Sequence, residues 1–483
     1  MRDDDVDPRG GNGPPVDRSR GENRGVRRTQ DSRADVDALL LREGLLLYSA
    51  KLSHTALAFA AGVVVARALG PAGKGTVQLL WLVPQLAAQL LILGLHQANV
   101  YFLGGPNGAA PQRESALLWN SLHVGLLLGF LGAAGVALAR VPLGSALGVA
   151  EDGLVLAAAL VPLSLVYTVL LYFLLGRKAF AQRNFVEVTT TAVLVVALVG
   201  LLWGARGGIR AAVIARIVAF GVAIVIAGWA LYRTGAAVRW TRLDPRLLRK
   251  TIGYGLRSQI GNVLQTFNLR IDMLFAGAFL GATDVGVYSV AVAAAEVLWF
   301  LPTAVGSVLF PTLAQRRTDG SRDVAARACR RAVLMTLAAA VPLAAGGRWL
   351  LPCVFGAAFA DGWLPLLILI PGVLALSVHR VLMPALMSWG RPQEMSYAAA
   401  IALAATVALD LLLIPRWGIR GAAAASTVAY SCCAAYTAGR FVRVTHAGWR
   451  DVCCPRAEDL RSVAAAAAEL ARRAFRFEKG RGR

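Results

Sequence analysis

The chain has 483 residues, of which 57% are hydrophobic and only 16% carry a charged side chain. A soluble fold of this length does not bury so much apolar surface, so the composition excludes a soluble globular protein and indicates a membrane protein. The formal net charge of +22 fits basic loops that bind anionic lipid headgroups, and we expect no nucleic-acid partner.

Twelve apolar stretches are long enough to cross a hydrocarbon core as helices, which takes about 20 residues each. Ala, Leu, Val and Gly dominate them, and the alternating ten-residue strands of a membrane barrel are absent. We therefore predict an all-α polytopic membrane protein. The predicted spans lie near 45–66, 77–100, 115–139, 154–175, 186–204, 209–232, 252–280, 285–310, 328–351, 363–388, 395–415 and 421–444.

The segments around these spans divide the chain into five regions. Residues 1–40 mix both charge signs without apolar periodicity, which predicts a disordered basic cytoplasmic tail. Two six-helix lobes follow, at 41–235 and 251–445, joined by a cytoplasmic linker at 236–250. Residues 446–483 predict a second basic cytoplasmic tail, whose apolar spacing is compatible with an interfacial amphipathic helix as well as with a frayed end.

The basic residues predict which side of the membrane the termini occupy. An even number of spans puts both termini on one face, and the loops of that face carry 17 Lys or Arg, against eight on the opposite face. By the positive-inside rule we expect both termini in the cytoplasm.

One half of the chain restates the other. Leu69–Gly75 after the first span matches Leu280–Gly286 after the seventh at an offset of 211, and Gly208–Ala212 matches Gly418–Ala422 at 210. Because each half has six spans, the copies must run parallel, related by a pseudo-twofold axis along the membrane normal. Duplicated chains of this kind are most often transporters with a binding site between the copies near mid-membrane.

Polar side chains inside the spans repeat at the same offset. Ionisable groups facing lipid cost several kcal/mol, so they should point into the bundle or a wet cavity. Lys51 corresponds to Asn262, and Gln85 corresponds to Glu296. We predict a central aqueous cavity lined by spans 1, 2, 7 and 8, although such groups also join helices by buried hydrogen bonds. The candidate substrate-binding residues are Lys51, His54, Arg67, Gln85, Arg257, Asn262, Gln265, Arg270 and Arg380.

Basic residues outnumber acids among these positions, which favours an anionic ligand such as a phosphate. Snorkelling toward headgroups is an alternative for Arg257. Asp272 and Glu296 are the ion-coupling candidates, because an acid in a low-dielectric cavity can bind a proton or help to hold Na⁺. The six cysteines lack zinc-ligand spacing, so we expect no metal site and no cofactor beyond a coupling ion.

No catalytic motif stands in the sequence. A Walker loop, HExxH, G-x-S-x-G and a nucleotide-binding domain are all missing. We therefore expect a transporter that is not an enzyme and does not hydrolyse ATP itself.

Several short motifs, in order across the spans, make the chain resemble the polysaccharide transporters and Wzx-type oligosaccharide flippases of the multidrug/oligosaccharidyl-lipid/polysaccharide (MOP) exporter superfamily. The resemblance covers about residues 42–445, with Asp410 a departure at a position where such proteins often carry Asn. The motifs are Ala66–Pro71, Arg270–Asp272, Gly286–Ala291, Phe355–Phe359, Gly390–Pro392 and Leu412–Ala423.

The resemblance implies a MATE-like fold and a flippase that moves a polyprenyl-pyrophosphate-linked oligosaccharide to the outer leaflet by alternating access, for cell-surface polysaccharide biosynthesis. It implies a multi-pass protein of a bacterial plasma (inner) membrane, with the lipid-linked oligosaccharide and membrane lipids as partners. A polysaccharide polymerase and glycosyltransferases of the pathway are further expected partners.

Other functions stay open at this point. An ion-coupled multidrug or small-molecule exporter of the same superfamily is disfavoured because the first span offers Lys51 and His54 but no acid. A membrane-embedded polysaccharide polymerase or ligase is disfavoured because the predicted external loops are short. A scaffold that transports nothing gives no reason for symmetric polar faces.

Overall fold

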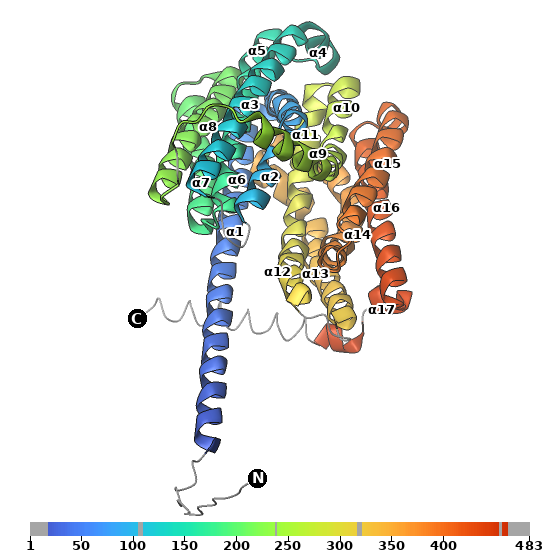
Figure 1. The fold of residues 1–483 in the computed structure, drawn as a ribbon. Coiled ribbons are helices and arrows are strands. Elements are labelled where there is room, and N and C mark those ends of the chain that lie inside the picture. Colours follow the sequence, from blue (N-terminus) through green and yellow to red (C-terminus); the bar gives the residue numbers. More distant parts are fainter. Residues whose placement is uncertain (1–17, 105–109, 237–238, 316–320, 454–455, 462–483) are drawn as a thin grey trace, which may run out of the picture. The chain divides into compact units, whose positions relative to one another are not determined.

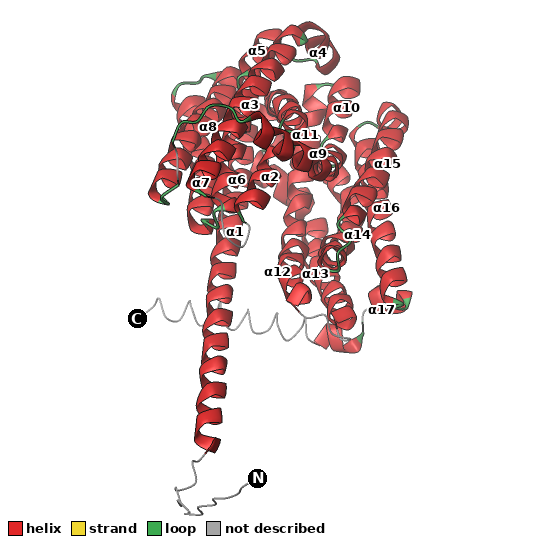
Figure 2. Ribbon diagram, viewed as in Figure 1, coloured by secondary structure: helices red, strands yellow, loops and turns green. Residues whose placement is uncertain are grey.

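The computed structural model describes residues 18–104, 110–236, 239–315, 321–453 and 456–461. Throughout this part of the chain the secondary structure is helical, with short loops and no strand (Figure 2). The predicted all-α polytopic class is therefore confirmed.

The helices follow one another with few intervening residues (Figure 1). Up to residue 233 they are α1 (Arg18–Leu91), α2 (Leu95–Leu103), α3 (Pro111–Leu138), α4 (Arg140–Leu147), α5 (Glu151–Ala158), α6 (Leu160–Gly176), α7 (Phe180–Val199), the π-helical turn η1 (Gly200–Gly204) and α8 (Gly208–Arg233). From residue 245 they are α9 (Pro245–Asn268), α10 (Ile271–Leu280), α11 (Ala282–Glu296), η2 (Val297–Trp299), α12 (Phe300–Gln315), α13 (Ser321–Phe355), η3 (Ala357–Gly362), α14 (Trp363–Ser388), α15 (Gln393–Trp417), α16 (Ile419–Thr445) and α17 (Trp449–Cys453).

The chain forms two compact units, residues 1–50 and residues 51–483. In the first unit the helix α1 begins at Arg18, so residues 18–40 are helical where the sequence predicts disorder. No proline stands between Pro15 and Pro71 to interrupt such a helix. Residues 1–17 of the predicted tail, and most of the predicted C-terminal amphipathic helix, lie outside the described residues.

Ten helical segments of the described chain are long and apolar enough to cross a membrane. One of them, 51–91, contains Gly70 with a φ of 67° and a ψ of −173°, which breaks the helix before Pro71. Only glycine adopts such a backbone without strain, and the break separates the predicted first and second spans. The predicted twelfth span is α16, which is rich in Ala, Ser and Thr and is not among these ten segments.

Helices of the same half pack mainly against one another. In the first half, α3 and α8 both pack on α6, and α7 packs on α8. In the second half, α12, α13 and α16 pack on α14, and α15 packs on α16. The corresponding cores are apolar: Phe173 and Val169 are fully buried in the first half, and Leu366 and Leu386 in the second.

The duplicated motifs meet each other in the structure. A Cβ placed on Gly75 would lie 1.7 Å from the carbonyl oxygen of Ala282, and a Cβ on Gly286 would lie 2.0 Å from that of Pro71. Gly286 is the repeat equivalent of Gly75, and Ala282 is the repeat equivalent of Pro71, each at the offset of 211. The two approaches are therefore equivalent contacts, one made by each copy. Residues beside a twofold axis contact their own equivalents in this way.

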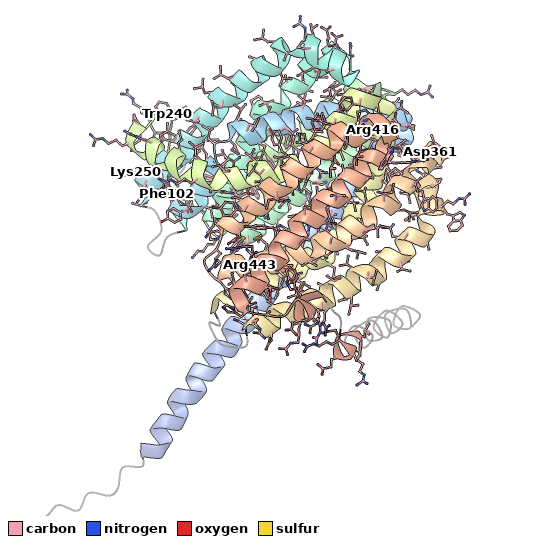
Figure 3. The ribbon with its side chains drawn as sticks, turned by 90° about the vertical axis from the view of Figure 1, so that its right-hand side faces the viewer. Phe102, Trp240, Lys250, Asp361, Arg416 and Arg443 are labelled. Atoms are coloured by element: carbon pink, nitrogen blue, oxygen red, sulfur yellow. The ribbon has the colours of Figure 1, made fainter. Side chains whose placement is uncertain are left out.

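Segments predicted for opposite faces of the membrane lie at different edges of the side-chain view. Phe102, Trp240 and Lys250 gather at one edge, and Asp361 and Arg416 lie near the opposite edge (Figure 3). The helix α9 begins at Pro245, inside the predicted linker, because the Asp244 carboxylate accepts hydrogen bonds from the first backbone amides of the helix.

Candidate functional site

A cavity of about 610 Å³ lies among α1, α2, α6, α7, α8 and α9. Of these helices, α9 is the only one from the second half. A volume in this range is typical of sites for small molecules and cofactors. Its wall carries neutral side chains for the most part, and none of the lining residues is an aspartate or a glutamate.

Four of the predicted site residues line this cavity: His54, Gln85, Asn262 and Gln265. His54 and Gln265 are related by the repeat offset of 211 and come from α1 and α9. The structure thus brings together the polar faces of the first and seventh spans.

Lys51, Arg67 and Arg257 lie away from the cavity wall. Lys51 is exposed, and its charge interacts with those of Arg380, Glu187 and others. Arg67 donates hydrogen bonds to carbonyl oxygens in the last turn of α13, where carbonyls lack helical partners. Arg257 is exposed on α9.

Arg270, Glu296 and Arg380 lie in the second half with partners of their own. Arg270 Nη1 donates to Glu296 Oε1 at 2.8 Å, so these two predicted site residues neutralise each other. The Arg380 guanidinium stacks 4.3 Å from the ring centroid of Trp299, and its Nη1 lies 3.3 Å from the hydroxyl oxygen of Thr303.

Arg216 on α8 also lines the cavity, although it is not among the site residues predicted from the sequence. Its guanidinium carbon lies 4.6 Å from the ring centroid of Trp81 and 5.5 Å from that of Phe220. Among the described residues no carboxylate forms an ion pair with it. Such a guanidinium keeps its N–H donors free of a carboxylate partner, and these donors are of the kind that bind anions.

Asp272 lies in a buried polar cluster of the second half. This carboxylate is only 2% exposed, and its Oδ2 accepts hydrogen bonds from the hydroxyls of Tyr288 at 2.7 Å and Ser426 at 3.2 Å. The charges of Asp272 and the fully buried Asp410 interact.

Asp410 has no hydrogen-bond partner on either carboxylate oxygen within the described residues. The amide nitrogen of Asn268 is also unpartnered, while its oxygen accepts a hydrogen bond from Thr406 at 2.9 Å. Buried polar groups nearly always have partners, and a buried carboxylate requires either a proton or a cation.

The sequence matches the polysaccharide biosynthesis protein family over residues 40–316, more than half of the chain. The chain belongs to this family. The chain is 22% identical over 212 residues to the probable low-salt glycan biosynthesis flippase Agl15 of Haloferax volcanii. The aligned residues make up 43% of this chain and 44% of Agl15. The chain thus spans less than half the length of that relative.

Solved structures with the same fold include two membrane transport proteins. One is an inward-facing multidrug resistance MATE family transporter of the MOP superfamily, with a TM-score of 0.69 at 16% identity, covering 84% of this chain and 99% of the other. The second is the lipid II flippase MurJ in an inward closed conformation, with a TM-score of 0.69 at 12% identity over 88% and 93% of the two chains. Identities this low establish the fold alone.

One signal in the sequence could have led to Arg216 and Asp410, which were not among the predicted site residues. Arg216 is a charged residue inside an apolar span, where a charge is costly unless it serves a purpose. At the local offset of 210 its equivalent in the second copy is Ser426, so the repeat does not mark it. Asp410 is likewise a charge within a span and departs from the family pattern. Charge at a span centre is the signal common to both residues.

Proposed function

We propose that this protein is a flippase that moves a polyprenyl-pyrophosphate-linked oligosaccharide across the membrane by alternating access, for the synthesis of cell-surface polysaccharide. The observation that carries the proposal is Arg216, a guanidinium facing the cavity with aromatic rings as its neighbours and no described carboxylate partner. Membership of the polysaccharide biosynthesis family supports the same substrate class.

The cavity chemistry suits this substrate in two ways. The pyrophosphate is an anion that Arg216 can bind with paired N–H donors. The glycan is neutral for the most part and bears hydroxyl groups, which amide and hydroxyl side chains bind. Gln85, Asn262, Gln265 and Thr190 are among the residues of this kind on the wall.

The same wall disfavours the two alternatives. A cavity that exports organic cations needs negative charge, and the lining residues include no carboxylate. A polymerase or ligase that relies on a carboxylate or a thiolate at its site is disfavoured, because neither an acid nor a cysteine stands on this wall.

In the proposed cycle the contact of Gly75 with Ala282 closes one end of the bundle while substrate enters from the other. Rocking of the two halves then opens the end at which these residues meet. With the loops rich in Lys and Arg in the cytoplasm, the closed end faces outward. The protein is then a component of a bacterial plasma membrane, with both termini inside, next to the glycosyltransferases and the polymerase of the pathway.

We also propose that the buried cluster of Asp272 and Asp410 binds the coupling ion, a proton or Na⁺. Two neighbouring buried carboxylates, one of them without hydrogen-bond partners, cannot both stay charged without compensation. The oxygens of Asn268, Thr406 and Ser426 are hard ligands of the kind that an alkali cation prefers. Glu296, the second coupling candidate, is compensated by Arg270.

A translocation assay tests the flippase proposal. The purified full chain is placed in liposomes with lipid-linked oligosaccharide isolated from the cells that express it, and arrival of glycan in the opposite leaflet is followed under proton and sodium gradients. Arg216→Ala should slow translocation about tenfold or more, because a hydrogen bond to a charged group contributes about 1.5–3 kcal/mol. Arg216→Lys should retain part of the rate, since the charge remains but the planar fork is lost.

Arg210→Ala is the matched control. Arg210 stands on the same helix, but its side chain is 70% exposed and pairs with Asp152, so this variant should transport as the unaltered protein does. Absence of translocation by the unaltered protein under every gradient would contradict the proposed function.

A further inference from the structure

Another pocket, of about 630 Å³ and more open than the central cavity, lies where α15 turns into α16, beside α14. It shares no lining residue with the central cavity. Arg416, one of its residues, lies near one edge of the molecule (Figure 3). The pocket is therefore a separate site at one end of the bundle. Its lining residues are Ile368, Arg416, Trp417, Arg420 and Ala424.

The two arginines of this pocket have no anionic partner in the described part of the chain. Both side chains are exposed, and neither Arg416 nor Arg420 forms an ion pair or a hydrogen bond with any described residue. Two like charges that line one small pocket repel each other unless an anion lies between them. Guanidinium groups present paired N–H donors that match the oxygens of a phosphate. The pair therefore suits a phosphate group.

The first copy carries the same motif in a neutralised form. The sequence Gly-Ile-Arg ends at Arg210 in the first copy and at Arg420 in the second, at an offset of 210. Arg210 pairs with Asp152 at 2.9 Å, whereas no described carboxylate pairs with Arg420. At the same offset, Trp417 stands where the first copy has Gly207. Only the second copy thus combines an aromatic side chain with an arginine that lacks a described acid.

The pocket stands at the level where an apolar span gives way to lipid headgroups. The membrane span formed by α15 ends at Trp417, and the indole is 60% exposed. Tryptophan is enriched at this depth because its ring is apolar and its N–H is polar. The phosphates of a leaflet lie at the same level, within reach of Arg416 and Arg420.

Apolar surface continues from each arginine toward the centre of the membrane. Leu412 lies four residues before Arg416 on α15, and Val428 lies eight residues after Arg420 on α16. Residues four or eight apart share one face of a helix and are separated by about 6 or 12 Å along its axis. Leu412 is 47% exposed and Val428 is 46% exposed. Cationic groups above two exposed apolar strips match the shape and charge of an anionic lipid.

The helices behind the pocket are held together tightly. The hydroxyl of Thr427 on α16 donates a hydrogen bond to the carbonyl oxygen of Ile368 on α14, at 2.5 Å. A Cβ placed on Gly372 would lie 2.6 Å from the Cα of Thr427, so the two backbones are in direct contact. Close packing of this kind keeps the wall of the pocket formed before a ligand binds.

We propose that this pocket binds an anionic phospholipid of the adjacent leaflet. Its phosphate lies between Arg416 and Arg420, its glycerol backbone lies beside Trp417, and an acyl chain runs along Leu412 or Val428. A resident membrane lipid suits the pocket better than the transported one, because every lining residue belongs to the second half and none belongs to the central cavity. The inference needs only a membrane around the bundle and does not depend on the proposed function.

Fluorine NMR of the purified full chain in a neutral detergent tests this site, with 5-fluorotryptophan in place of tryptophan. Loss of one signal in Trp417→Phe identifies Trp417 among the 11 tryptophans of the chain. Phosphatidylglycerol, whose headgroup charge is that of its phosphate, should shift this signal to saturation. Zwitterionic phosphatidylcholine should bind at least about tenfold more weakly, because its choline offsets the phosphate charge.

The double variant Arg416→Gln with Arg420→Gln should bind phosphatidylglycerol at least about tenfold more weakly, and each single variant should show a smaller loss. The signals of the other tryptophans show whether these variants keep the fold. Arg206→Gln with Arg210→Gln is the matched control, because these exposed residues occupy the same positions in the first copy. The response of the Trp417 signal in this control should equal that of the unaltered protein.

Equal affinity for the two phospholipids, or unchanged affinity in the double variant, would overturn the proposal. Inorganic phosphate that saturates the Trp417 signal as readily as phosphatidylglycerol would reduce the pocket to a site for a free anion, which also contradicts a lipid site. Tighter binding of polyprenyl pyrophosphate than of phosphatidylglycerol would assign the pocket to an isoprenoid lipid and likewise overturn the assignment to a membrane phospholipid.

Discussion

Asp410 is a fully buried carboxylate in the middle of α15, and neither oxygen has a hydrogen-bond partner in the described chain. An isolated buried charge is costly, so such a residue persists in a fold when it performs a task that a neutral residue cannot. Its neighbour Asp272 is held by Tyr288 and Ser426. Hydrogen bonds thus hold Asp272 in place, whereas Asp410 has none, and in the proposed coupling site Asp410 is the acid that takes up the cation or the proton.

Replacing Asp410 by Asn tests this role at the level of one residue. The amide has nearly the same shape without the charge, so the fold should stay intact and gain about 1–3 kcal/mol in the free energy of unfolding, provided that Asp410 is charged when empty. Translocation by Asp410→Asn should no longer accelerate when a proton or sodium gradient is imposed, as measured in the same liposomes.

Asp361→Asn is the control, since Asp361 is an exposed acid in η3. Asp361→Asn should keep the gradient response. A response that survives in Asp410→Asn would contradict the assignment of the coupling ion to the buried cluster.

The charged residues show what a sequence can and cannot predict at this scale. The sequence assigns Arg270 and Glu296 to a common cavity as separate substrate-binding and ion-coupling candidates, whereas in the structure they form an ion pair with each other. Periodicity gives the face of a helix on which a residue lies, but not the neighbouring helix that this face meets. Arg216 is missed for a related reason, because its partners are the rings of Trp81 and Phe220, which read as ordinary apolar residues.

At the scale of elements, the segment after the last span is tied to α13 by a buried ion pair. Arg330 Nε donates to Asp459 Oδ2 at 2.6 Å, and the two side chains are only 4% and 1% exposed. Arg330 also donates to the backbone carbonyl of Asp451, and the backbone amide of Arg456 donates to the Asp459 carboxylate. Val452 adds apolar packing beside Ala325 and Leu309.

This arrangement makes docking of the segment dependent on pH. Burial raises the pKa of the Asp459 carboxyl, but hydrogen bonds from Arg330 and from the Arg456 backbone, with the Arg330 charge, outweigh it and hold the pKa below its ordinary value of 3.8. A carboxyl with a lowered pKa in the folded state contributes stability above its ordinary pKa, and this contribution is lost as the pH falls through the lowered value. Docking should therefore be complete at neutral pH and weaken in strong acid.

Asp459→Asn should release the segment at neutral pH, because it leaves the Arg330 charge buried without its partner, at a cost of about 3–5 kcal/mol. Hydrogen exchange of residues 446–453 and 456–461 measures the release and should become much faster than in the unaltered protein. Glu458→Gln is the matched control, since Glu458 is exposed next to Asp459 in the same segment. Unchanged exchange in Asp459→Asn would show that packing alone holds the segment.

The sequence was most informative about the elements themselves. Gly70 and Gly281, each with a positive φ, divide the helices where the repeated motifs predict span ends, because turns with such backbone angles favour glycine strongly. The helical state of residues 18–40 was not predicted, since charged residues without apolar periodicity suit a tail as well as a solvated helix.

At the scale of the whole molecule, the contact of the two copies at Gly75 and Gly286 is the one that closes an end of the bundle in the proposed cycle. Helices cross there with backbone against backbone, since a single added Cβ at Gly75 would overlap the carbonyl oxygen of Ala282. Close crossings of this kind rely on glycine, as do many tight helix pairs in membranes. The closed end and the cavity are thus linked through the helix that carries both Gly75 and Gln85.

Gly75→Ala should force this end apart and shift the population toward the state that is open there. Spin labels at Ala72 and Thr283, exposed residues related by the offset of 211, measure the separation by electron spin resonance. The unaltered protein should give mainly a short distance, whereas the variant should give mainly a longer one. Transport requires the protein to pass through both the open and the closed state of this end. A variant confined to one of these states should therefore translocate lipid-linked oligosaccharide at least about tenfold more slowly.

Gly228→Ala is the matched control for this experiment, because a Cβ at Gly228 in α8 meets nothing within 4 Å. Its distance distribution and transport rate should equal those of the unaltered protein. A Gly75→Ala variant that folds and still shows the short distance would mean that the helices can slide past one another at this crossing without opening. The steric contact between the duplicated motifs would then play no part in controlling access, and closure would depend on the packing of the helices elsewhere in the bundle.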